Sequence, residues 1–428
     1  MENRLVLDGP YKNKDFFNFT TTSEQPRHQW YYFKEGFSST LVKEAINATN
    51  SKKKLSILDP FSGSGTTALT SALLGHKATG IEVNPFLHFT SIIKSSVWEL
   101  EESKIHNLIN KIVDESKPGA FSDLEGFSTF TSKEGLDKWL FNTSVIRRYT
   151  GTLHAINKHV DAHLQPLYKF AALISAMECS NVKKDGKGVR YKKGWQSTAY
   201  SGSDFEREFK HLVLKIANDV KNNPIDKKFV PEILLSDSRS YFTSEKRPDN
   251  EFDLVITSPP YLNSFDYTDI YRPELFLGGF VADNLELRKL RLQTLRSHVQ
   301  VDWNGDINFR TPYLKKFYDL ILERKDMLWN KRIPLMVEAY FDDLATILLQ
   351  LKSCLRKNGQ IWLVVSTSAY AGVHIPVDLI IGELGHELNL RLKGIHCLRY
   401  LRTSSQQYAQ LNTNKAPLRE SLIILEKV

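Results

Sequence analysis

Residues 55–68 read Leu55-Ser56-Ile57-Leu58-Asp59-Pro60-Phe61-Ser62-Gly63-Ser64-Gly65-Thr66-Thr67-Ala68 and predict a strand, a glycine turn and a helix in direct succession. The apolar run at 55–58 is short and bounded by polar residues, which is typical of a buried parallel strand. Glycines let the backbone of the turn approach a ligand closely, and the start of the helix offers free amide groups. This order of elements lifts a glycine-rich match above chance and predicts a nucleotide site.

A second predicted strand, at residues 78–81, ends at Glu82. An acidic side chain at this position is placed to accept hydrogen bonds from ribose hydroxyls. The third position of the glycine fingerprint is Ala68, so the turn is compatible with a dinucleotide or with S-adenosylmethionine. A plain tight turn with a solvated strand end is the alternative interpretation.

The other informative stretch is Asp253-Leu254-Val255-Ile256-Thr257-Ser258-Pro259-Pro260-Tyr261. Its apolar run predicts another buried strand, and the two prolines end the ladder because neither can donate a backbone hydrogen bond. Carbonyl groups are then left at the sheet edge, between a hydroxyl and a phenol ring. Such a place suits a flat molecule that bears an amino group, although a lone Pro-Pro-Tyr is also compatible with a simple turn and a core tyrosine.

Taken together, the two stretches resemble the paired motifs of the exocyclic-amino DNA methyltransferases, which form N4-methylcytosine or N6-methyladenine. In that family the first motif holds S-adenosylmethionine and the second holds a base flipped out of DNA. The resemblance covers roughly residues 28–98 and 232–279, with a weaker match in the C-terminal tail. It implies an α/β, Rossmann-like, S-adenosylmethionine-dependent methyltransferase with a mostly parallel seven-stranded sheet and helical insertions.

The resemblance also implies a catalytic set. Ser258 and the Pro259 carbonyl are expected to accept hydrogen bonds from the target amine, and Tyr261 is expected to stack on the flipped base. These acceptors favour a tetrahedral nitrogen placed in line with the methyl group. The expected catalytic residues are Ser258, Pro259, Pro260 and Tyr261.

The implied cofactor site draws on two further regions. Phe37 resembles the family's N-terminal motif, which closes over the methionine end of the cofactor. Asp237, at the end of a strand predicted at 231–238, stands where the family places a contact to the adenine ring. The expected cofactor-binding residues are Phe37, Asp59, Pro60, Phe61, Gly63, Ser64, Gly65, Thr66, Glu82 and Asp237.

The choice between the two amino products depends on a single residue, Ser258. Serine at the head of the motif is usual in the N4-cytosine branch, whereas Asp or Asn is commoner among N6-adenine enzymes. We therefore expect N4-methylcytosine, with N6-methyladenine as the nearest rival. An RNA amino-methyltransferase and a DNA-binding protein without transfer activity are the remaining alternatives, and the intact motifs argue against the last because a binder needs neither.

Formation of 5-methylcytosine is excluded because it requires a cysteine nucleophile in a Pro-Cys dipeptide. The three cysteines follow a glutamate, a serine and a histidine: Cys179, Cys354 and Cys397. They also lack the spacing of a disulfide framework or a zinc site. A cluster of histidines, without nearby carboxylates or cysteines, is expected to line a helix face rather than to hold a metal: His154, His159 and His163.

Composition is consistent with a nucleic-acid enzyme. The 428 residues are 41% hydrophobic and 25% charged, and the formal net charge is +8, which suits a polyanionic partner. The N-terminus lacks the apolar core of a signal peptide, and no run approaches the 18 apolar residues of a membrane span. We expect a cytoplasmic protein that acts on double-stranded DNA without a metal. The expected setting is a restriction-modification system whose cognate endonuclease acts separately.

Domain boundaries follow from the positions of the motifs. Residues 1–99 and 231–428 are expected to form the catalytic domain. Two helical patterns predict a helical insertion at residues 100–230, and a second insertion is expected at 283–335. The cofactor motif precedes the base motif, which resembles the family's alpha arrangement and favours residues 100–230 as the target-recognition region.

Basic side chains are concentrated in both insertions and are candidates for contacts with DNA. The glycine-rich segment 181–195 is predicted to be a mobile cationic loop, with a solvated surface loop as the alternative. Arginines of the second insertion would suit base reading or, equally, a charged helix face. The DNA-binding candidates are Lys183, Lys184, Arg190, Lys192, Arg288, Arg291 and Arg296.

Overall fold

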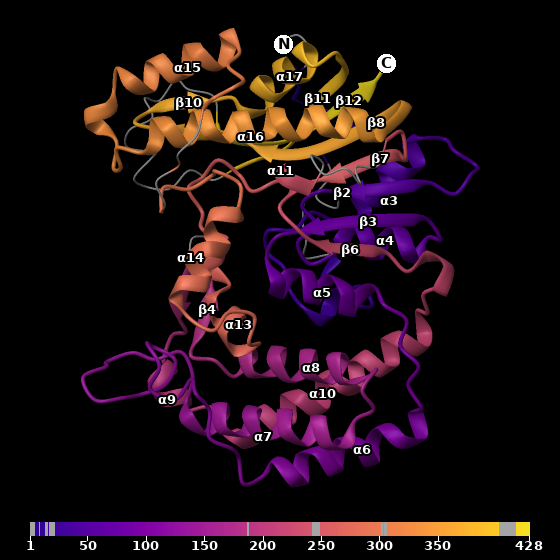
Figure 1. The fold of residues 1–428 in the computed structure, drawn as a ribbon, viewed down its shortest axis with the longest axis vertical. Helices are drawn as coiled ribbons and strands as arrows, with labels where there is room; N and C mark the ends of the chain where they lie inside the picture. The colour runs from indigo at the N-terminus through magenta and orange to yellow at the C-terminus, as the bar shows by residue number, and fades with distance from the viewer. Residues whose placement is uncertain are drawn as a thin grey trace.

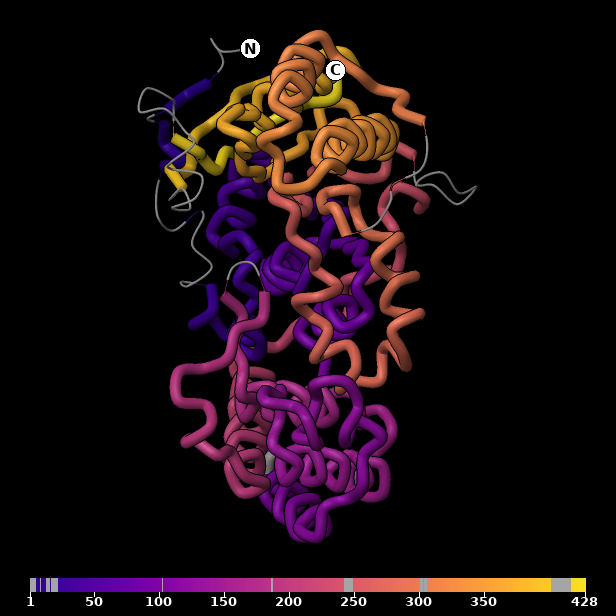
Figure 2. The backbone as a smooth tube through the Cα atoms, turned by 90° about the vertical axis from the view of Figure 1, so that its left-hand side faces the viewer, coloured from indigo at the N-terminus to yellow at the C-terminus, as the bar shows by residue number. Residues whose placement is uncertain are grey.

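The computed structural model describes residues 5–7, 9–12, 16, 22–185, 188–241, 249–300, 303, 306–401 and 417–428. Figure 1 shows an upper body built on a twisted sheet and a lower layer of helices that lies away from the sheet. In the perpendicular view of Figure 2 the molecule is elongated, with the C-terminal part of the chain at one end and the helical layer at the other.

The sheet has eight strands and is mostly parallel. In spatial order its strands are β1 (Leu5–Val6), β11 (Leu390–Tyr400), β12 (Arg419–Lys427), β8 (Leu355–Ser366), β7 (Phe252–Thr257), β2 (Ser56–Asp59), β3 (Lys77–Glu82) and β6 (Glu232–Leu235). Only β12 runs antiparallel to its two neighbours. The seven expected strands are therefore present, and the two-residue β1, which the sequence did not predict, extends the sheet beyond β11.

Successive residues of the central strand β7 face opposite layers. Leu254 and Ile256 pack in one apolar cluster with helix α3 (Ser39–Ala48). Val255 packs in another cluster with helix α16 (Ile333–Cys354). Because both faces are covered, the middle of β7, Leu254 to Ile256, is a continuous apolar run rather than an alternating one, as expected of a buried parallel strand.

Three helices follow strands in the manner predicted for a nucleotide-binding fold. Helix α4 (Thr66–Leu73) follows β2, α5 (Pro85–Ser95) follows β3, and α17 (Val377–Glu387) lies between β8 and β11. Asn84 caps α5 through its side-chain oxygen, which accepts from the amides of Phe86 and Leu87. These starts place helix N-termini at the carboxyl edge of the sheet.

The segment predicted as a helical insertion consists mainly of helices and also contains one hairpin. Its elements are α6 (Glu102–Ser116), α7 (Thr143–His159), α8 (Gln165–Glu178), β4 (Val182–Lys184), β5 (Val189–Tyr191), α9 (Trp195–Thr198) and α10 (Gly202–Asn222). The segment predicted as a mobile loop forms the β4–β5 hairpin, because Val182, Val189 and Tyr191 give it strand character. Residues 186 and 187 of that segment lie outside the described residues.

The remaining helices and strands are mostly short. They are the 3-10 helices η2 (His28–Trp30), η3 (Lys227–Phe229) and η4 (Lys325–Met327), the helices α11 (Ser238–Tyr241), α12 (Tyr267–Ile270), α13 (Arg272–Leu277), α14 (Asn284–Gln293) and α15 (Pro312–Leu322), and the antiparallel pair β9 (Ser368–Tyr370) and β10 (Val373–Ile375). In Figure 1, α14 bridges the space between the sheet and the helical layer. Among the described residues, no helix combines the length and apolar character needed to cross a membrane.

Candidate active site

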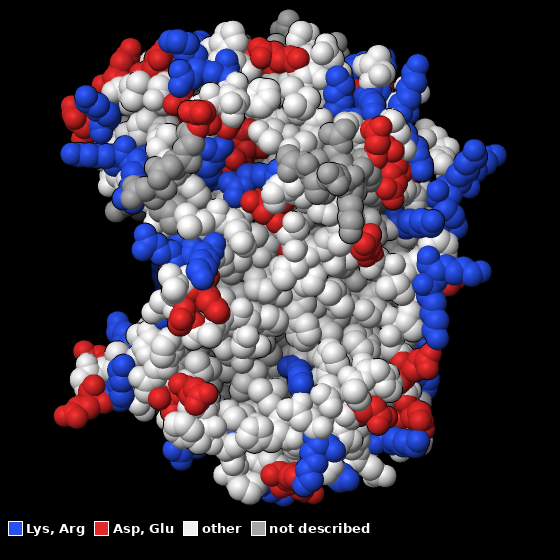
Figure 3. Space-filling view, viewed as in Figure 1, with Lys and Arg blue, Asp and Glu red and all other residues white. Residues whose placement is uncertain are grey.

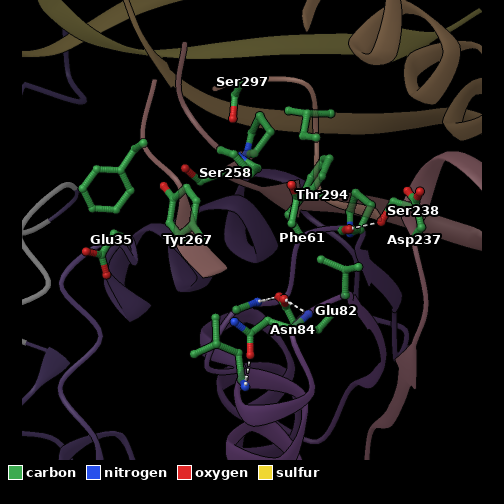
Figure 4. A pocket seen from close by; sticks show the side chains of 18 of the residues that line it. Glu35, Phe61, Glu82, Asn84, Asp237, Ser238, Ser258, Tyr267, Thr294 and Ser297 are labelled. Carbon is green, nitrogen blue, oxygen red and sulfur yellow. Dashed lines mark hydrogen bonds between the residues drawn. The ribbon is translucent and has the colours of Figure 1, made fainter. Parts of the chain in front are cut away.

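A cavity opens at the carboxyl ends of β2, β3, β6 and β7, where the two sequence motifs meet. Its walls include Gly63 from the glycine turn, Glu82 from the end of β3, Asp237 after β6, and Ser258 and Tyr261 after β7. The empty space among the lining residues is about 1120 Å³, a volume that includes open solvent at the mouth. Figure 4 shows side chains from these different elements pointing into one space.

The glycine turn is fixed by backbone hydrogen bonds. Ser62 donates from its amide to the Ile81 carbonyl at 2.9 Å, and the Gly65 amide donates to the Ser62 carbonyl at 2.8 Å. Gly63 has φ +51°, and a Cβ there would lie 2.8 Å from the Phe33 ring, so a side chain would be both strained and crowded. Phe33 also lines the cavity, which places this aromatic side chain against the turn.

Glu82 binds the glycine turn directly. Its two carboxylate oxygens accept from the amides of Gly63 at 2.7 Å and Asn84 at 2.8 Å (Figure 4). Burial raises the pKa of Glu82 to about 7, while these amides favour the ionised form and work against that rise. Each carboxylate oxygen keeps a lone pair for a further donor.

Asn84 adds a polar group that the sequence analysis did not identify. Its side chain is buried and lines the cavity, and its oxygen is used in capping α5. Its Nδ2 has no hydrogen-bond partner among the described residues. A buried amide without an acceptor is costly, so Nδ2 is available to a ligand oxygen.

Asp59, predicted to bind the cofactor, instead joins the two motifs from behind. It is buried, it does not line the cavity, and its Oδ1 accepts from the Thr257 hydroxyl at 2.6 Å and from the Phe61 amide at 3.0 Å. Burial raises the pKa of Asp59 to about 6. The carboxylate therefore ties the tip of β2 to the tip of β7 and sets the spacing between the glycine turn and Ser258.

The Ser-Pro-Pro-Tyr residues all line the cavity. Tyr261 donates its hydroxyl to Glu420 Oε1 at 2.8 Å, and the Ser258 hydroxyl lies 3.5 Å from the Tyr261 oxygen. Burial, followed by the charge of Glu420, raises the pKa of Tyr261, so this phenol stays neutral. Glu420 lies on β12 and pairs with Arg399 at 2.8 Å.

Asp237 lines the cavity but is not a free carboxylate. Arg239 contacts both of its oxygens and comes within 2.7 Å. The same arginine reaches Asp343 of α16 at 3.3 Å, and Asp343 in turn holds Arg296 at 2.8 Å. The position of Asp237 is thereby linked to α16 and to the second insertion.

A further wall of the cavity comes from the second insertion. Residues 293–295, 297 and 298, at the end of α14 and beyond it, line the space opposite the glycine turn. Figure 4 shows Ser297 with its hydroxyl directed into the cavity. The Ser297 carbonyl accepts from the Ser264 amide at 3.1 Å, which fastens this wall to the loop that follows Tyr261.

The structure separates the predicted cofactor residues into two groups. Those that line the cavity are Pro60, Phe61, Gly63, Glu82 and Asp237, whereas those that do not are Phe37, Asp59, Ser64, Gly65 and Thr66. Phe37 instead lines an adjoining smaller hollow behind Tyr261. Gly65 packs against α5, where a Cβ would lie 2.3 Å from Ser91 Oγ.

The predicted DNA-binding residues also fall into two groups, those paired with groups of the protein itself and those exposed to solvent. Lys184 is held by Glu274 and donates to the Tyr31 hydroxyl at 2.6 Å; Arg291 pairs with Asp266 at 2.5 Å. With Arg296 held by two aspartates, these three cations are satisfied inside the protein. Lys192 donates to the Glu178 carbonyl at 2.8 Å, and Arg190 pairs with Asp185 while staying exposed. Lys183 and Arg288 are exposed.

Several lining residues carried no sequence signal that we used: Phe33, Glu35, Asn84, Arg239 and the wall at 293–298. Asn84 precedes a proline at the start of a helix, and this capping pattern is readable from sequence. The wall has no comparable signature, because it reaches the cavity only through the folding of the second insertion. The described residues contain no group of three or more His, Cys, Asp or Glu arranged to hold a metal ion.

An α/β sheet of this strand order, with a glycine turn, an acid after the next strand and a Ser-Pro-Pro-Tyr loop in one cavity, defines a nucleotide-dependent group-transfer site of methyltransferase type. Comparison with known proteins also indicates a methyltransferase. Residues 7–92 match a family model described as DNA methylase, for N6 and N4 methyltransferases. The chain is 28% identical to the Type II methyltransferase M.BsoBI of Geobacillus stearothermophilus, over 97% of this chain and 88% of that protein.

Two further relatives are similar over most of their length. The Type II methyltransferase M.AvaI of Nostoc sp. is 24% identical over 97% of this chain and 89% of its own. The Type II methyltransferase M.MvaI of Kocuria varians is 22% identical over 88% of this chain and 85% of its own. The family model and these relatives support assignment to the exocyclic-amino DNA methyltransferases, the enzymes that methylate cytosine N4 or adenine N6.

Proposed function

We propose that the protein transfers a methyl group from S-adenosylmethionine to the N4 amine of cytosine in double-stranded DNA. The observation that carries the choice of cytosine is Ser258, a neutral hydroxyl at the head of the proline pair, in the cavity that also holds Gly63 and Glu82. The rival product, N6-methyladenine, is formed on the same fold and is the second candidate.

The residues of the cavity fit the cofactor. Glu82 has unused lone pairs for two ribose hydroxyls, and Asn84 has an unpartnered amide for a further ligand oxygen. Phe61, Ile81 and Leu87 supply apolar surface for an adenine ring, and Asp237 stands beside them to accept from its amine. When bound, the cofactor supplies a methyl group on a positively charged sulfur.

The residues after β7 are proposed to hold the base. Ser258 and the Pro259 carbonyl accept the hydrogens of the exocyclic amine, and Tyr261 packs against the flipped ring to replace part of its lost stacking. Since the tyrosine hydroxyl is bonded to Glu420, the phenol ring is held in one orientation before a base arrives. A fixed ring and fixed acceptors lower the entropy cost of placing the amine for attack.

The relatives M.BsoBI, M.AvaI and M.MvaI are named Type II methyltransferases, and we infer that this chain likewise modifies one DNA sequence within a restriction-modification system. Residues 100–230 are proposed to recognise the target, with the second insertion contributing. Figure 3 shows Lys and Arg side chains over α14, where the left edge of the molecule is hollowed between the sheet body and the helical layer. The exposed Arg288 lies on that helix.

The experiment that tests the product uses unmethylated plasmid DNA and cofactor with an isotopically labelled methyl group. Nucleoside mass spectrometry after digestion is expected to find the label in N4-methylcytosine, and sequencing at base resolution then gives the target site. Label found in N6-methyladenine would overturn the cytosine assignment. Label incorporated only when folded RNA replaces DNA would overturn the DNA substrate. Ser258→Ala serves as the site control and is expected to lose most transfer.

A further inference from the structure

The Ser-Pro-Pro-Tyr motif has a serine, Ser258, at the position where related motifs can carry an aspartate. An acidic side chain is nevertheless present elsewhere in the site. Glu420 lies on β12, far along the chain from Ser258, and its carboxylate contacts the motif only through the Tyr261 hydroxyl. We propose that Ser258, Tyr261 and Glu420 form a proton relay that removes the proton released by the methylated amine. This inference rests on the proposed amino-methyltransferase function and holds for either base.

The hydrogen bonds give the relay a direction. Tyr261 donates to Glu420 at 2.8 Å, so the tyrosine oxygen is left to accept, and the Ser258 hydroxyl at 3.5 Å is the donor beside it. The serine oxygen then presents only lone pairs to the cavity, as an acceptor of amine hydrogens must. The distance of 3.5 Å is at the outer limit for a hydrogen bond, and such bonds in ligand-free active sites are commonly long and shorten when substrate binds.

The relay also leads out of the catalytic cavity. Tyr261 lines both the main cavity and the smaller hollow behind it, whereas Ser258 lines only the first and Glu420 only the second. Arg399 pairs with Glu420 at the edge of that hollow and is 40% exposed. A proton that reaches Glu420 has therefore crossed the tyrosine and can pass to solvent away from the bound base.

The step balances without any further reactant. The amine lone pair forms the new N–C bond while the S–C bond breaks and leaves its electron pair on sulfur. One amine proton passes to the Ser258 oxygen, the serine proton passes to the Tyr261 oxygen, and the tyrosine proton passes to the Glu420 carboxylate. Ser258 and Tyr261 end the step neutral, which agrees with the raised pKa of the phenol. Glu420 acts through Tyr261 and is therefore a positioning and proton-accepting residue rather than one that touches substrate.

The test compares Glu420→Gln and Tyr261→Phe, which keep side-chain shape, with their double variant. Single-turnover rates on duplex DNA are expected to fall by about 10²-fold in each single variant, the lower end of the range for general acid–base catalysis, and to fall no further in the double variant. The KM values for cofactor and DNA are expected to stay near wild type, and Glu420→Asp is expected to recover part of kcat. Glu426→Gln is the matched control, because Glu426 is another buried acid of β12, paired with Arg391 at 2.7 Å, and is expected to keep the wild-type rate.

A second readout does not depend on turnover. In protein labelled with ¹³C at the glutamate side-chain carboxyl carbon, without cofactor or DNA, the Glu420 resonance is assigned by its loss in Glu420→Gln and is expected to shift in Tyr261→Phe. Wild-type kcat in Glu420→Gln would overturn the relay, as would additive losses in the double variant or an unshifted resonance. If labelled methyl groups appear on neither base with the wild-type protein, the proposed function fails instead, and the resonance still reports whether tyrosine and glutamate are coupled.

Discussion

The Glu82 carboxylate accepts a 2.7 Å hydrogen bond from the amide of Gly63 and so joins the end of β3 to the glycine turn that follows β2. The same carboxylate accepts from Asn84 at the start of α5. One acidic side chain therefore shapes the turn, fixes the helix that borders the cavity, and faces the space proposed for the ribose.

This relationship predicts a pH dependence of cofactor binding. Burial raises the pKa of Glu82 to about 7, and only the ionised form accepts from two ribose hydroxyls while it keeps its two amide bonds. Affinity for the product S-adenosylhomocysteine, measured by titration calorimetry, is expected to increase as the pH rises from about 6 to about 8. Glu82→Gln is expected to weaken binding and to flatten this dependence. An unchanged slope in Glu82→Gln would assign the titration to another group.

The same raised pKa has the opposite sign for stability. Between the ordinary carboxyl pKa of 4.5 and about 7, the folded protein holds a proton on Glu82 that the unfolded chain has lost. The free energy of unfolding therefore falls as the pH rises through this window and is steady above it. Denaturation of the ligand-free protein at several pH values is expected to show a smaller fall in Glu82→Gln than in wild type.

Gly65 is expected to be a stability position more than a binding position. It has φ +84°, and an added Cβ would lie 2.3 Å from Ser91 Oγ and 3.1 Å from the Ser91 backbone. Gly65→Ala is expected to destabilise the protein by about 2 kcal/mol through strain and overpacking. Adding Ser91→Ala relieves the tightest clash and should recover part of the stability in chemical denaturation. Complete recovery would show that the left-handed backbone costs nothing here.

Local sequence patterns predicted the sheet and the meeting of the two motifs well, because both depend on short segments. The apolar runs at β2, β3 and β7 are buried strands, and the glycine turn stands between β2 and α4 as expected. Apolar residues recur at helical spacing from Tyr149 to Leu164, yet α7 stops at His159, with Val160 as an extended cap, and residues 165–178 form a separate helix. A run of apolar residues at helical spacing continues across a tight turn without any signal of the break.

What sequence did not predict depends on contacts between distant segments. Lys184 was a candidate for phosphate contacts because it lies in a basic, glycine-rich segment, yet it binds Glu274, ninety residues further along the chain. Asp59 matched a motif, but its carboxylate turns to Thr257 rather than to the cavity. The wall at 293–298 and the acid Glu420 reach the site from other parts of the fold, and nothing in their local sequence shows this.

The aspartate pair on α16 is expected to control both stability and the cofactor site. Asp343 contacts Arg239 at 3.3 Å and Arg296 at 2.8 Å, and its side chain is only 4% exposed. Breaking a buried pair on one side costs about 3–5 kcal/mol, and Asp343→Ala is expected to cost about 2–3 kcal/mol because Asp237 and Asp342 remain as partners. Arg239 would then hold Asp237 less firmly, so a weaker affinity for S-adenosylhomocysteine should accompany the destabilisation.

The control for this prediction is an exposed pair. Lys227 and Glu99 lie 2.7 Å apart with side chains more than 70% exposed, and such pairs contribute little. Lys227→Ala is expected to leave both the denaturation midpoint and the affinity unchanged. An Asp343→Ala protein of wild-type stability would show that the α16 aspartates do not brace the site.

Lys184 and Arg288 provide the sharpest test of which basic residues meet DNA. Lys184 Nζ lies 3.8 Å from the centre of the Tyr271 ring, donates to Tyr31 at 2.6 Å and neutralises the buried Glu274. Lys184→Met is therefore expected to destabilise the protein by about 3 kcal/mol, since it leaves a buried carboxylate unpaired. Under conditions in which Lys184→Met is folded, its affinity for DNA should show the same salt dependence as that of the wild-type protein.

Arg288→Ala is expected to show the reverse. Its side chain is exposed on α14, at the hollowed edge where Figure 3 shows Lys and Arg side chains next to Asp and Glu, so stability should not change. Removing a guanidinium that binds a phosphate lowers affinity for all DNA sequences and reduces the slope of log affinity against log salt by about 1. Fluorescence anisotropy with a labelled duplex over a series of salt concentrations measures that slope. An unchanged slope in Arg288→Ala together with a reduced slope in Lys184→Met would move the DNA path away from α14 and onto the β4–β5 hairpin.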